Sequence, residues 1–361
     1  MKSRHFFVLS ALALAASLTA CGGGGGGDAP QPTSTAIQVP TTVPTTTVPT
    51  PTIPVATIPT VLTNSLVTSV PAPTYAAGSE ELAAFNLLNA ERDACGFGLL
   101  AQNGAIDSAA QRHSDYQILN NVITHDQNQQ TMPTGFTGTT VVDRLIAAKY
   151  IASDADRAST YETIVGSGTS TKTGQGALGV RRLMNAPYHM IGMFSETHEV
   201  GIALRNGADN NSTTPGNYGT FDFSSRSSAG NQLPDSSTVR TYPCNGTTGA
   251  LRLLTGEIPN PVPGRDLNLN PLGSSVYINV RKGNTIAINT VSFVNVATGA
   301  SVVTRLPISE KNDPNGSFRS HEAYIAADAP LDKSTKYRVM ITGTNNGVAF
   351  SKDFVFTASS D

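Results

Sequence analysis

The chain has 361 residues, a formal net charge of −2 and only 14% charged residues. With this balance of charges we expect no strongly positive surface. This argues against nucleic acid as a partner and against electrostatic binding to an anionic membrane. The length that remains after the N-terminal low-complexity segment exceeds one typical domain, so we expect two folded domains.

Residues 1–20 have the composition of a bacterial export signal. Lys2 and Arg4 precede an apolar stretch that is too short to span a membrane, and small residues follow. The run Leu18 to Cys21 resembles the lipobox of bacterial lipoproteins, which implies acylation of Cys21 and membrane attachment through that lipid. An ordinary signal peptide is the alternative. By analogy with Gram-negative sorting, glycine after the cysteine favours the outer membrane, so the predicted location is the cell envelope or surface.

Residues 21–77 are rich in Gly, Pro and Thr, and no Lys or Arg occurs between Arg4 and Arg92. Proline recurs every few residues, which favours extended conformations and prevents a packed core. The segment is therefore predicted to be a disordered tether between the lipid and the folded part.

Two cysteines remain if Cys21 carries lipid. Cys95 and Cys244 can form a disulfide in an oxidising envelope, and the alternative is a pair of buried free thiols.

The first folded region, residues 78–246, begins with helical patterns and ends with strands. A serine cap and two glutamates predict a helix over 79–95. Further helices are expected at 107–120, around 140–150, and from 176 to a stop at Pro187. The final patterns alternate and predict strands over 198–207 and 217–225. Helices first and strands late, without a repeating βαβ order, indicate an α+β fold.

Several segments of this region, in this order, resemble the bacterial branch of the CAP superfamily (cysteine-rich secretory, antigen 5 and pathogenesis-related, or SCP-like, proteins). The resemblance extends from Ser79 to Cys244 and rests on "NLLNAER", "AAQRHSDY", "THD", "VDRLIAAKY", "NAPYH" and "EVGIAL". It implies a three-layer α-β-α sandwich with a central cleft of histidines and glutamates. Some members bind a divalent metal there, and others bind sterols or fatty acids.

Carried onto this sequence, the resemblance places His125, Glu162 and His189 together in the cleft. Two imidazoles and a carboxylate can hold zinc or another divalent metal, or share protons as an acid/base set. The sequence departs from the family around these positions, and the family's second glutamate has no clear match. Glu196 and Glu199 are only nearby carboxylates.

Two further residues have a structural and a functional interpretation. His113 is expected to pack in its helix facing the sheet, with a ligand role as the alternative. Arg144 is expected to be an ion-pair partner at the helix surface, with a site role as the alternative.

Residues 260–361 contain short alternating runs rich in β-branched residues, separated by Gly, Asn and Asp turns. This spacing predicts an all-β sandwich, and its final strands resemble bacterial immunoglobulin-like modules. His321 is expected at the surface and Tyr324 in the core.

Three functions are compatible with these patterns. The leading hypothesis is a lipid-anchored envelope protein whose CAP domain binds a small apolar, amphipathic or sterol-like ligand, or a partner protein. The alternatives are a metal-assisted hydrolase that uses His125, Glu162 and His189, and a structural surface adhesin. The sequence contains no Gly-x-Ser-x-Gly motif and no zinc-protease histidine pair, so an enzyme is the less favoured class.

Overall fold

The computed structural model describes residues 65–169, 171–210 and 216–361, which fall within one compact unit. The predicted signal, Cys21 and most of the predicted tether lie outside these residues. Within the described ranges, no helix is both long enough and apolar enough to cross a membrane.

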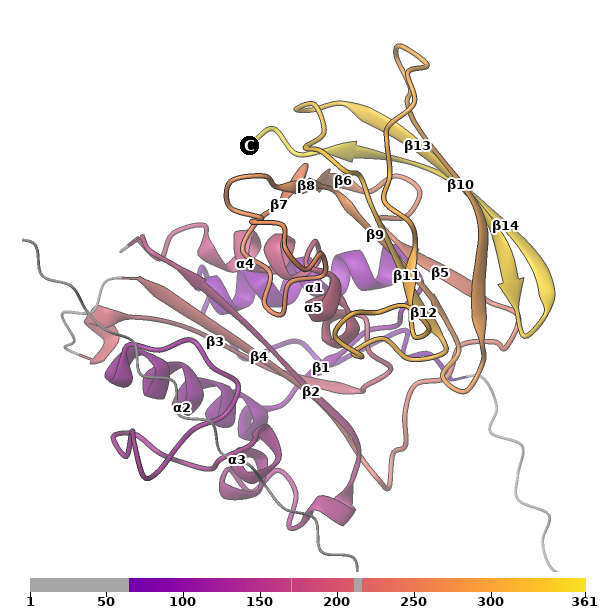
Figure 1. Ribbon diagram of the computed structural model, residues 1–361. Helices are drawn as coiled ribbons and strands as arrows, with labels where there is room; N and C mark the ends of the chain where they lie inside the picture. The colour runs from indigo at the N-terminus through magenta and orange to yellow at the C-terminus, as the bar shows by residue number, and fades with distance from the viewer. Residues whose placement is uncertain (1–64, 170, 211–215) are drawn as a thin grey trace, which may run out of the picture. The chain divides into compact units, whose positions relative to one another are not determined.

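A four-stranded sheet with the order β1-β3-β4-β2 lies at the centre of the first region (Figure 1). β1 runs parallel to β3, and the other neighbours are antiparallel. Its strands are β1 (Ala101–Gln102), β2 (Arg157–Ser167), β3 (Glu199–Asn206) and β4 (Asn217–Arg226). The two predicted strands are confirmed as β3 and β4. β4 is buried almost throughout, because helices cover both faces of this sheet.

Two groups of helices make these covers (Figure 1). One face carries α2 (Gly104–Asn120) and α3 (Val141–Ala147), and Ser114 of α2 hydrogen-bonds Thr220 of β4 at 2.8 Å. The other face carries α1 (Glu80–Ala94), α4 (Gln175–Leu183) and α5 (Pro187–Met193). The predicted α+β class is confirmed, in a three-layer arrangement.

Local capping explains where these helices begin. Ser79 accepts a hydrogen bond from the backbone of Leu82, so α1 begins where the sequence predicts. α2 begins three residues earlier than predicted, because the Asn103 side chain accepts from the backbone of Ala105. Single 3₁₀ turns lie at Asp154–Asp156 and Gly207–Asn210.

The expected helix from 176 to Pro187 is instead two helices. α4 ends at Leu183, and Pro187 opens α5 as its first residue. Proline lacks an N–H and has a fixed φ, which disrupts a helix interior but suits the first turn. The proline therefore starts a helix here, and the prediction that it ends one was wrong.

The rest of the described chain forms strands. One four-stranded sheet has the order β11-β12-β9-β5, a second has the order β10-β13-β14-β6, and β7 pairs with β8. The bounds are β5 (Val239–Tyr242), β6 (Thr248–Ala250), β7 (Leu253–Leu254), β8 (Leu272–Gly273), β9 (Ser275–Val280), β10 (Ile286–Asn295), β11 (Ile308–Ser309), β12 (Glu322–Ala326), β13 (Lys336–Asn345) and β14 (Val348–Ala358).

The two four-stranded sheets bury one hydrophobic cluster, to which Ile278 and Val280 contribute from one sheet and Val339 and Phe354 from the other. Tyr324 is buried, as expected. The immunoglobulin-like class of this region stays a prediction.

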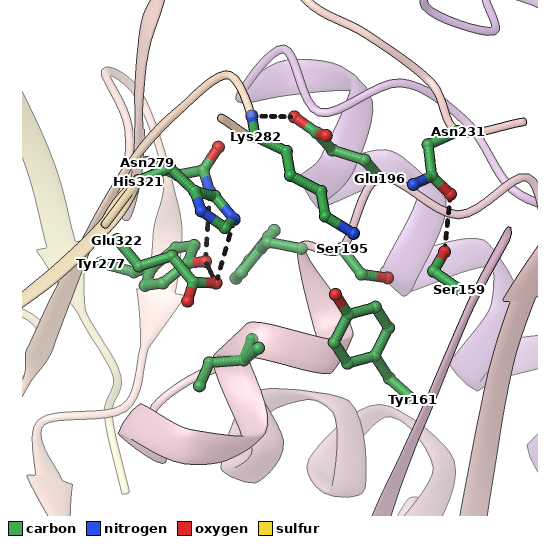
Figure 2. A pocket seen from close by; sticks show the side chains of 12 residues that line it. Ser159, Tyr161, Ser195, Glu196, Asn231, Tyr277, Asn279, Lys282, His321 and Glu322 are labelled. Atoms are coloured by element: carbon green, nitrogen blue, oxygen red, sulfur yellow. Dashed lines mark hydrogen bonds and ion pairs between the residues drawn. The ribbon is translucent and has the colours of Figure 1, made fainter. Parts of the chain in front are cut away.

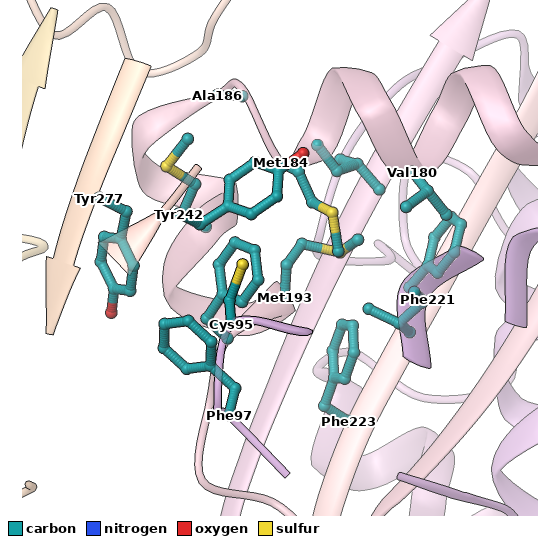
Figure 3. Packing of buried hydrophobic residues seen from close by; sticks show 14 of the residues in the cluster. Cys95, Phe97, Val180, Met184, Ala186, Met193, Phe221, Phe223, Tyr242 and Tyr277 are labelled. Carbon is teal, nitrogen blue, oxygen red and sulfur yellow. The ribbon is translucent and has the colours of Figure 1, made fainter. Parts of the chain in front are cut away.

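A second hydrophobic cluster joins the helical and strand-rich regions (Figure 3). The ring of Phe194, after α5, lies 4.5 Å from that of Phe97, 4.8 Å from that of Tyr242 and 5.9 Å from that of Tyr277, measured between centroids. β5 lies within the predicted range 78–246, yet it pairs with β9. Side chains from both regions therefore share one core.

A disulfide joins Cys95 to Cys244, with 5.5 Å between their Cα atoms. It connects the end of α1 to the residues after β5. The structure contains the predicted pairing.

Candidate functional site

The structure brings two of the three predicted cleft residues together and separates the third. Nδ1 of His125 donates a hydrogen bond to Glu162 Oε1 at 3.0 Å. His189 lies on α5, across the sheet from this pair. Successive residues of a strand point to opposite faces: Thr163 of β2 contacts Met193 of α5, so its neighbour Glu162 faces α2 and α3. The expected trio is therefore wrong as a single cluster.

Glu162 is the centre of a buried polar network. Its side chain is only 3% exposed, and its Oε2 accepts a hydrogen bond from the guanidinium of Arg144. The ring nitrogen Nε2 of His113 lies 3.6 Å from Oε1. Burial by itself would raise the pKa of Glu162, but the hydrogen bond with His125 and the positive charge of Arg144 hold it below its usual value. Glu162 is therefore ionised at neutral pH.

Arg144 is a buried partner, which corrects its expected place at the helix surface. The whole residue is 1% exposed, and its guanidinium also donates to the carbonyl of Thr139 at 3.1 Å. It lies on α3, whose start is fixed by a capping box between Thr140 and Asp143. The cap thus sets the position of the cation that balances Glu162.

His113 packs against this network from α2, as its structural interpretation predicts. It is fully buried; its Nε2 lies 2.8 Å from the carbonyl oxygen of Thr124, and its Nδ1 lies 3.1 Å from Nε2 of Gln127. The amide of Gln127 donates and the carbonyl of Thr124 accepts, which fits the neutral tautomer with its proton on Nε2. Burial lowers the pKa of His113 to about 4. His113 therefore contributes no charge at neutral pH.

Asp222 is a member of this cluster that the sequence did not reveal. It lies on β4 directly opposite Glu162 in the antiparallel register and is fully buried. Neither carboxyl oxygen has a hydrogen-bond partner among the described residues. Burial, followed by the negative charge of Glu162, raises the pKa of Asp222 well above its usual value. Asp222 is therefore protonated at neutral pH.

His125 is the route from this network to solvent. Its side chain is 53% exposed, whereas those of Glu162, Arg144 and His113 are 3% exposed or less. Glu162 holds Nδ1, which leaves Nε2 of the imidazole as the nitrogen that can meet another molecule. Such a carboxylate–histidine pair orients the ring and can bind a polar group or move a proton.

An exposed apolar side chain lies two residues before His125 in the chain. Ile123 is 62% exposed, and its side chain covers Gly166 of β2 closely enough to fill the space that a Cβ would occupy there. Glu162, which holds His125, lies four residues before Gly166 on the same face of β2. Ile123 and His125 therefore present an apolar and a polar group along one strand.

His189 has a separate partner that the sequence did not indicate. Its Nδ1 lies 3.0 Å from Oε2 and 3.2 Å from Oε1 of Glu257, and the backbone N–H of Tyr188 also donates to Glu257. The side chain of Glu257 is 2% exposed. Glu257 follows β7, so this contact fastens the start of α5 to the segment after that strand.

The donor set does not fit the divalent metal that the resemblance implies. Both carboxylate oxygens of Glu162 are engaged, one by Arg144 and one by His125. In the part of the chain that the structure describes, no three His, Cys, Asp or Glu residues are grouped so that they could hold a metal ion. Of the nearby carboxylates, Glu199 accepts from Tyr150 and Glu196 pairs with Arg240.

No family model matches this chain, and no curated protein does. Among solved structures, it is similar to an outer surface protein from Borrelia burgdorferi, with a TM-score of 0.32 and 16% identity, over 42% of this chain and 96% of that one. It is also similar to an extracellular protein containing an SCP domain from Bacillus anthracis str. Ames, with a TM-score of 0.29 and 22% identity, over 39% of each chain. Each likeness spans less than half of this chain, and membership of the CAP superfamily stays a prediction.

Proposed function

We propose that this chain is an exported, lipid-anchored surface protein whose helical region binds an amphipathic ligand, or a partner segment of that character, at His125 and Ile123. The observation that carries this proposal is that both side chains pack along β2: buried Glu162 holds the half-exposed imidazole, and the exposed isoleucine covers Gly166. The polar group of the ligand would meet Nε2 of His125, and its apolar part would lie on Ile123.

The polar network supports a binding role because it is costly to build. Burying an ion pair such as Glu162–Arg144 requires both charges to leave water, and apolar residues of the same volume often serve stability equally well. Ionisable groups with strongly shifted pKa values cluster at functional sites. The network ends at one exposed imidazole, where a ligand can reach it.

An enclosed apolar ligand such as a sterol receives less support. A pocket between β2, α4 and β4, lined by Val165, Gly179 and Leu204 among others, encloses about 210 Å³, open solvent included. Most of this volume is open solvent, and the enclosed space admits little more than one water molecule, far below the about 300–1,000 Å³ of small-molecule sites. We therefore favour a ligand that lies on the surface along β2.

Export is supported by the disulfide together with the N-terminal sequence. A disulfide that closes a long stretch of chain persists in oxidising compartments. The signal and the lipidated Cys21 are carried into the proposal from the sequence, and mass spectrometry of the mature N-terminus in a bacterial host would test them.

Binding can be tested with a dansyl-labelled fatty acid as the amphipathic probe. Because the chain has no tryptophan, the dansyl signal is free of indole fluorescence. We expect saturable enhancement that weakens about tenfold in His125→Ala and in Ile123→Ser. Val348→Ser, which changes another exposed apolar residue far along the chain, is the matched control. Equal binding by all four proteins would contradict the proposal.

A second candidate, an acid/base hydrolase, is favoured by the opposite pKa shifts of Glu162 and Asp222. Pairs of carboxyl groups with separated pKa values serve as acid and base in many enzymes. A hydrolase would lose activity toward ester or peptide substrates in His125→Ala while its fold is kept. A structural adhesin would show neither ligand binding nor hydrolysis.

A further inference from the structure

The polar pocket on the α5 side of β2 has little room for a ligand (Figure 2). Most of its volume is open solvent, and the enclosed space admits little more than one water molecule. The carboxylate of Glu196 in its wall is balanced by the guanidinium of Arg240 at 3.1 Å. His321 also lies in this wall with a side chain that is 12% exposed, which corrects its expected surface position. The exposed imidazole of the proposed site, His125, lies on the opposite side of β2.

His125 lies in a short loop segment, residues 124–127, whose two ends contact one buried imidazole. Nε2 of His113 lies 2.8 Å from the carbonyl oxygen of Thr124, and Nδ1 of the same ring lies 3.1 Å from Nε2 of Gln127. Thr124 directly precedes His125, and Gln127 follows it by two residues. His113, on α2, therefore bridges the two ends of the segment that carries the exposed imidazole.

These two contacts need one donor and one acceptor on the same ring. The carbonyl of Thr124 can only accept, so Nε2 of His113 donates to it. The orientation of the Gln127 amide is fixed because its oxygen accepts from the backbone N–H of Thr137 at 2.7 Å. Its nitrogen therefore faces His113 and donates to Nδ1. A neutral imidazole with its proton on Nε2 satisfies both ends of the segment at once.

Gln127 extends this connection to the residues before α3. The whole residue is 1% exposed, and its backbone N–H donates to the carbonyl of Thr139 at 2.9 Å. The same carbonyl accepts from Arg144 at 3.1 Å, and Arg144 balances Glu162, the partner of His125. The loop backbone is therefore fastened to the same buried network that holds the imidazole through its side chain.

We propose that His113 and Gln127 are positioning residues of the proposed site. They hold the backbone on both sides of His125, so that its Nδ1 stays on Glu162 and its Nε2 remains available to a ligand. The inference rests on the proposed function for the role of His125, and it adds which buried residues fix the orientation of that imidazole. A half-exposed histidine without such ties samples several rotamers, and ordering it on binding lowers the affinity. The ties prepare the imidazole before a ligand arrives.

The first measurement needs no ligand, because it reports the orientation of His125 itself. Glu162 accepts from Nδ1, so neutral His125 carries its proton on that nitrogen, and imidazole ¹⁵N chemical shifts distinguish this tautomer from the one protonated on Nε2. We expect the Nδ1–H signature in the full chain and its loss in Gln127→Met, which keeps a long unbranched side chain but removes the amide. Hydrogen exchange over residues 122–127 should become about tenfold faster in the same variant.

Variants of His113 separate positioning from packing. His113→Phe keeps an aromatic ring but has no nitrogen, so both contacts are lost. His113→Gln supplies an amide that can still donate to the carbonyl of Thr124, and we expect it to keep more of the His125 signature than His113→Phe does. Ser114→Ala is the matched control, because Ser114 is a buried neighbour on α2 whose hydroxyl contacts Thr220 of β4. Its shifts and exchange should match those of the parent protein.

Unchanged His125 shifts and unchanged loop exchange in Gln127→Met would overturn the inference, and so would an equal response in Ser114→Ala. Loss of the signature in Gln127→Met and His113→Phe, with partial recovery in His113→Gln, would support it. Because both readouts are taken without ligand, they decide the positioning role even if the dansyl-labelled fatty acid fails to bind, which would contradict the proposed function alone. Gln127→Met changes a residue outside the helices and strands, so it tests the inference even if His113→Phe fails to fold.

Discussion

Glu162 and Asp222 face each other across two antiparallel strands, one ionised and the other protonated. Residues opposite each other in such a pair have Cβ atoms about 5 Å apart. Two carboxylates that close in a buried site repel strongly, so one of them keeps its proton. Arg144 and His125 contact Glu162, which decides that Asp222 is the protonated partner.

This assignment predicts that the two carboxyl groups respond differently to replacement by amides. Glu162→Gln removes the charge that balances buried Arg144, and we expect a loss of about 3 kcal/mol in the free energy of unfolding. Asp222→Asn replaces one neutral polar group by another and should cost less than half of that. Urea denaturation at pH 7 measures both. Equal losses would mean that Asp222 is ionised.

His113 predicts a pH dependence of stability with a definite sign. Its pKa is about 4 in the folded protein and about 6.5 in the unfolded chain. Between these values the unfolded chain binds more protons, so the free energy of unfolding from this group falls as the pH drops from 6.5 to 4. The difference is about 3 kcal/mol.

The variant His113→Asn should therefore lose stability less steeply than the parent protein over this range. Ser114→Ala changes a buried neighbour on the same helix that does not titrate, so its slope should match that of the parent. Urea denaturation at several pH values from 4 to 7 provides the slopes. An unchanged slope in His113→Asn would show that His113 does not titrate in this way.

The contact between His189 and Glu257 predicts an energetic coupling between α5 and the segment after β7. A hydrogen bond that involves a charged group contributes about 1.5–3 kcal/mol. In a double-mutant cycle of His189→Gln and Glu257→Ala, we expect a coupling energy of about 1–2 kcal/mol. Additive losses would instead indicate that the contact is absent in solution.

The disulfide predicts a large stability difference between the oxidised and reduced protein. The cysteines are separated by 149 positions, and closing such a loop stabilises the fold by about 5 kcal/mol in the chain-entropy description. The double variant Cys95→Ser, Cys244→Ser should unfold at correspondingly lower urea concentration. Reduced parent protein is the control and should behave like the variant. A variant as stable as the oxidised parent would contradict the prediction.

Local signals in the sequence were sufficient for much of the secondary structure. The serine cap predicts where α1 begins, and residue alternation predicts β3 and β4. The two cysteines that remain after Cys21 predict the disulfide. The position of Pro187 was predicted wrongly because a proline is compatible with either end of a helix. Only the buried residues 184–186, which separate α4 from α5, place it at the beginning of a helix.

The site was harder to predict because strand alternation and long-range pairing decide it. Glu162 meets His125 since both lie on the α2 side of β2, while His189 belongs to the opposite side. Asp222 carries no local signal, because the two phenylalanines that flank it in "TFDF" point to the opposite face of the strand, and only the helices over its own face bury the carboxyl. Glu257 has no local signal either, since its partner is 68 positions away.

The ring cluster of Phe97, Phe194, Tyr242 and Tyr277 determines how this protein can be dissected. A fragment that ends after the last helix-packed strand would expose Phe97 and Phe194 to water, and a fragment that begins after β5 would leave Tyr277 uncovered. The two regions are therefore not interchangeable modules that could be shuffled or expressed separately. Measurements on either region therefore need the whole folded chain, in which this shared core stays covered.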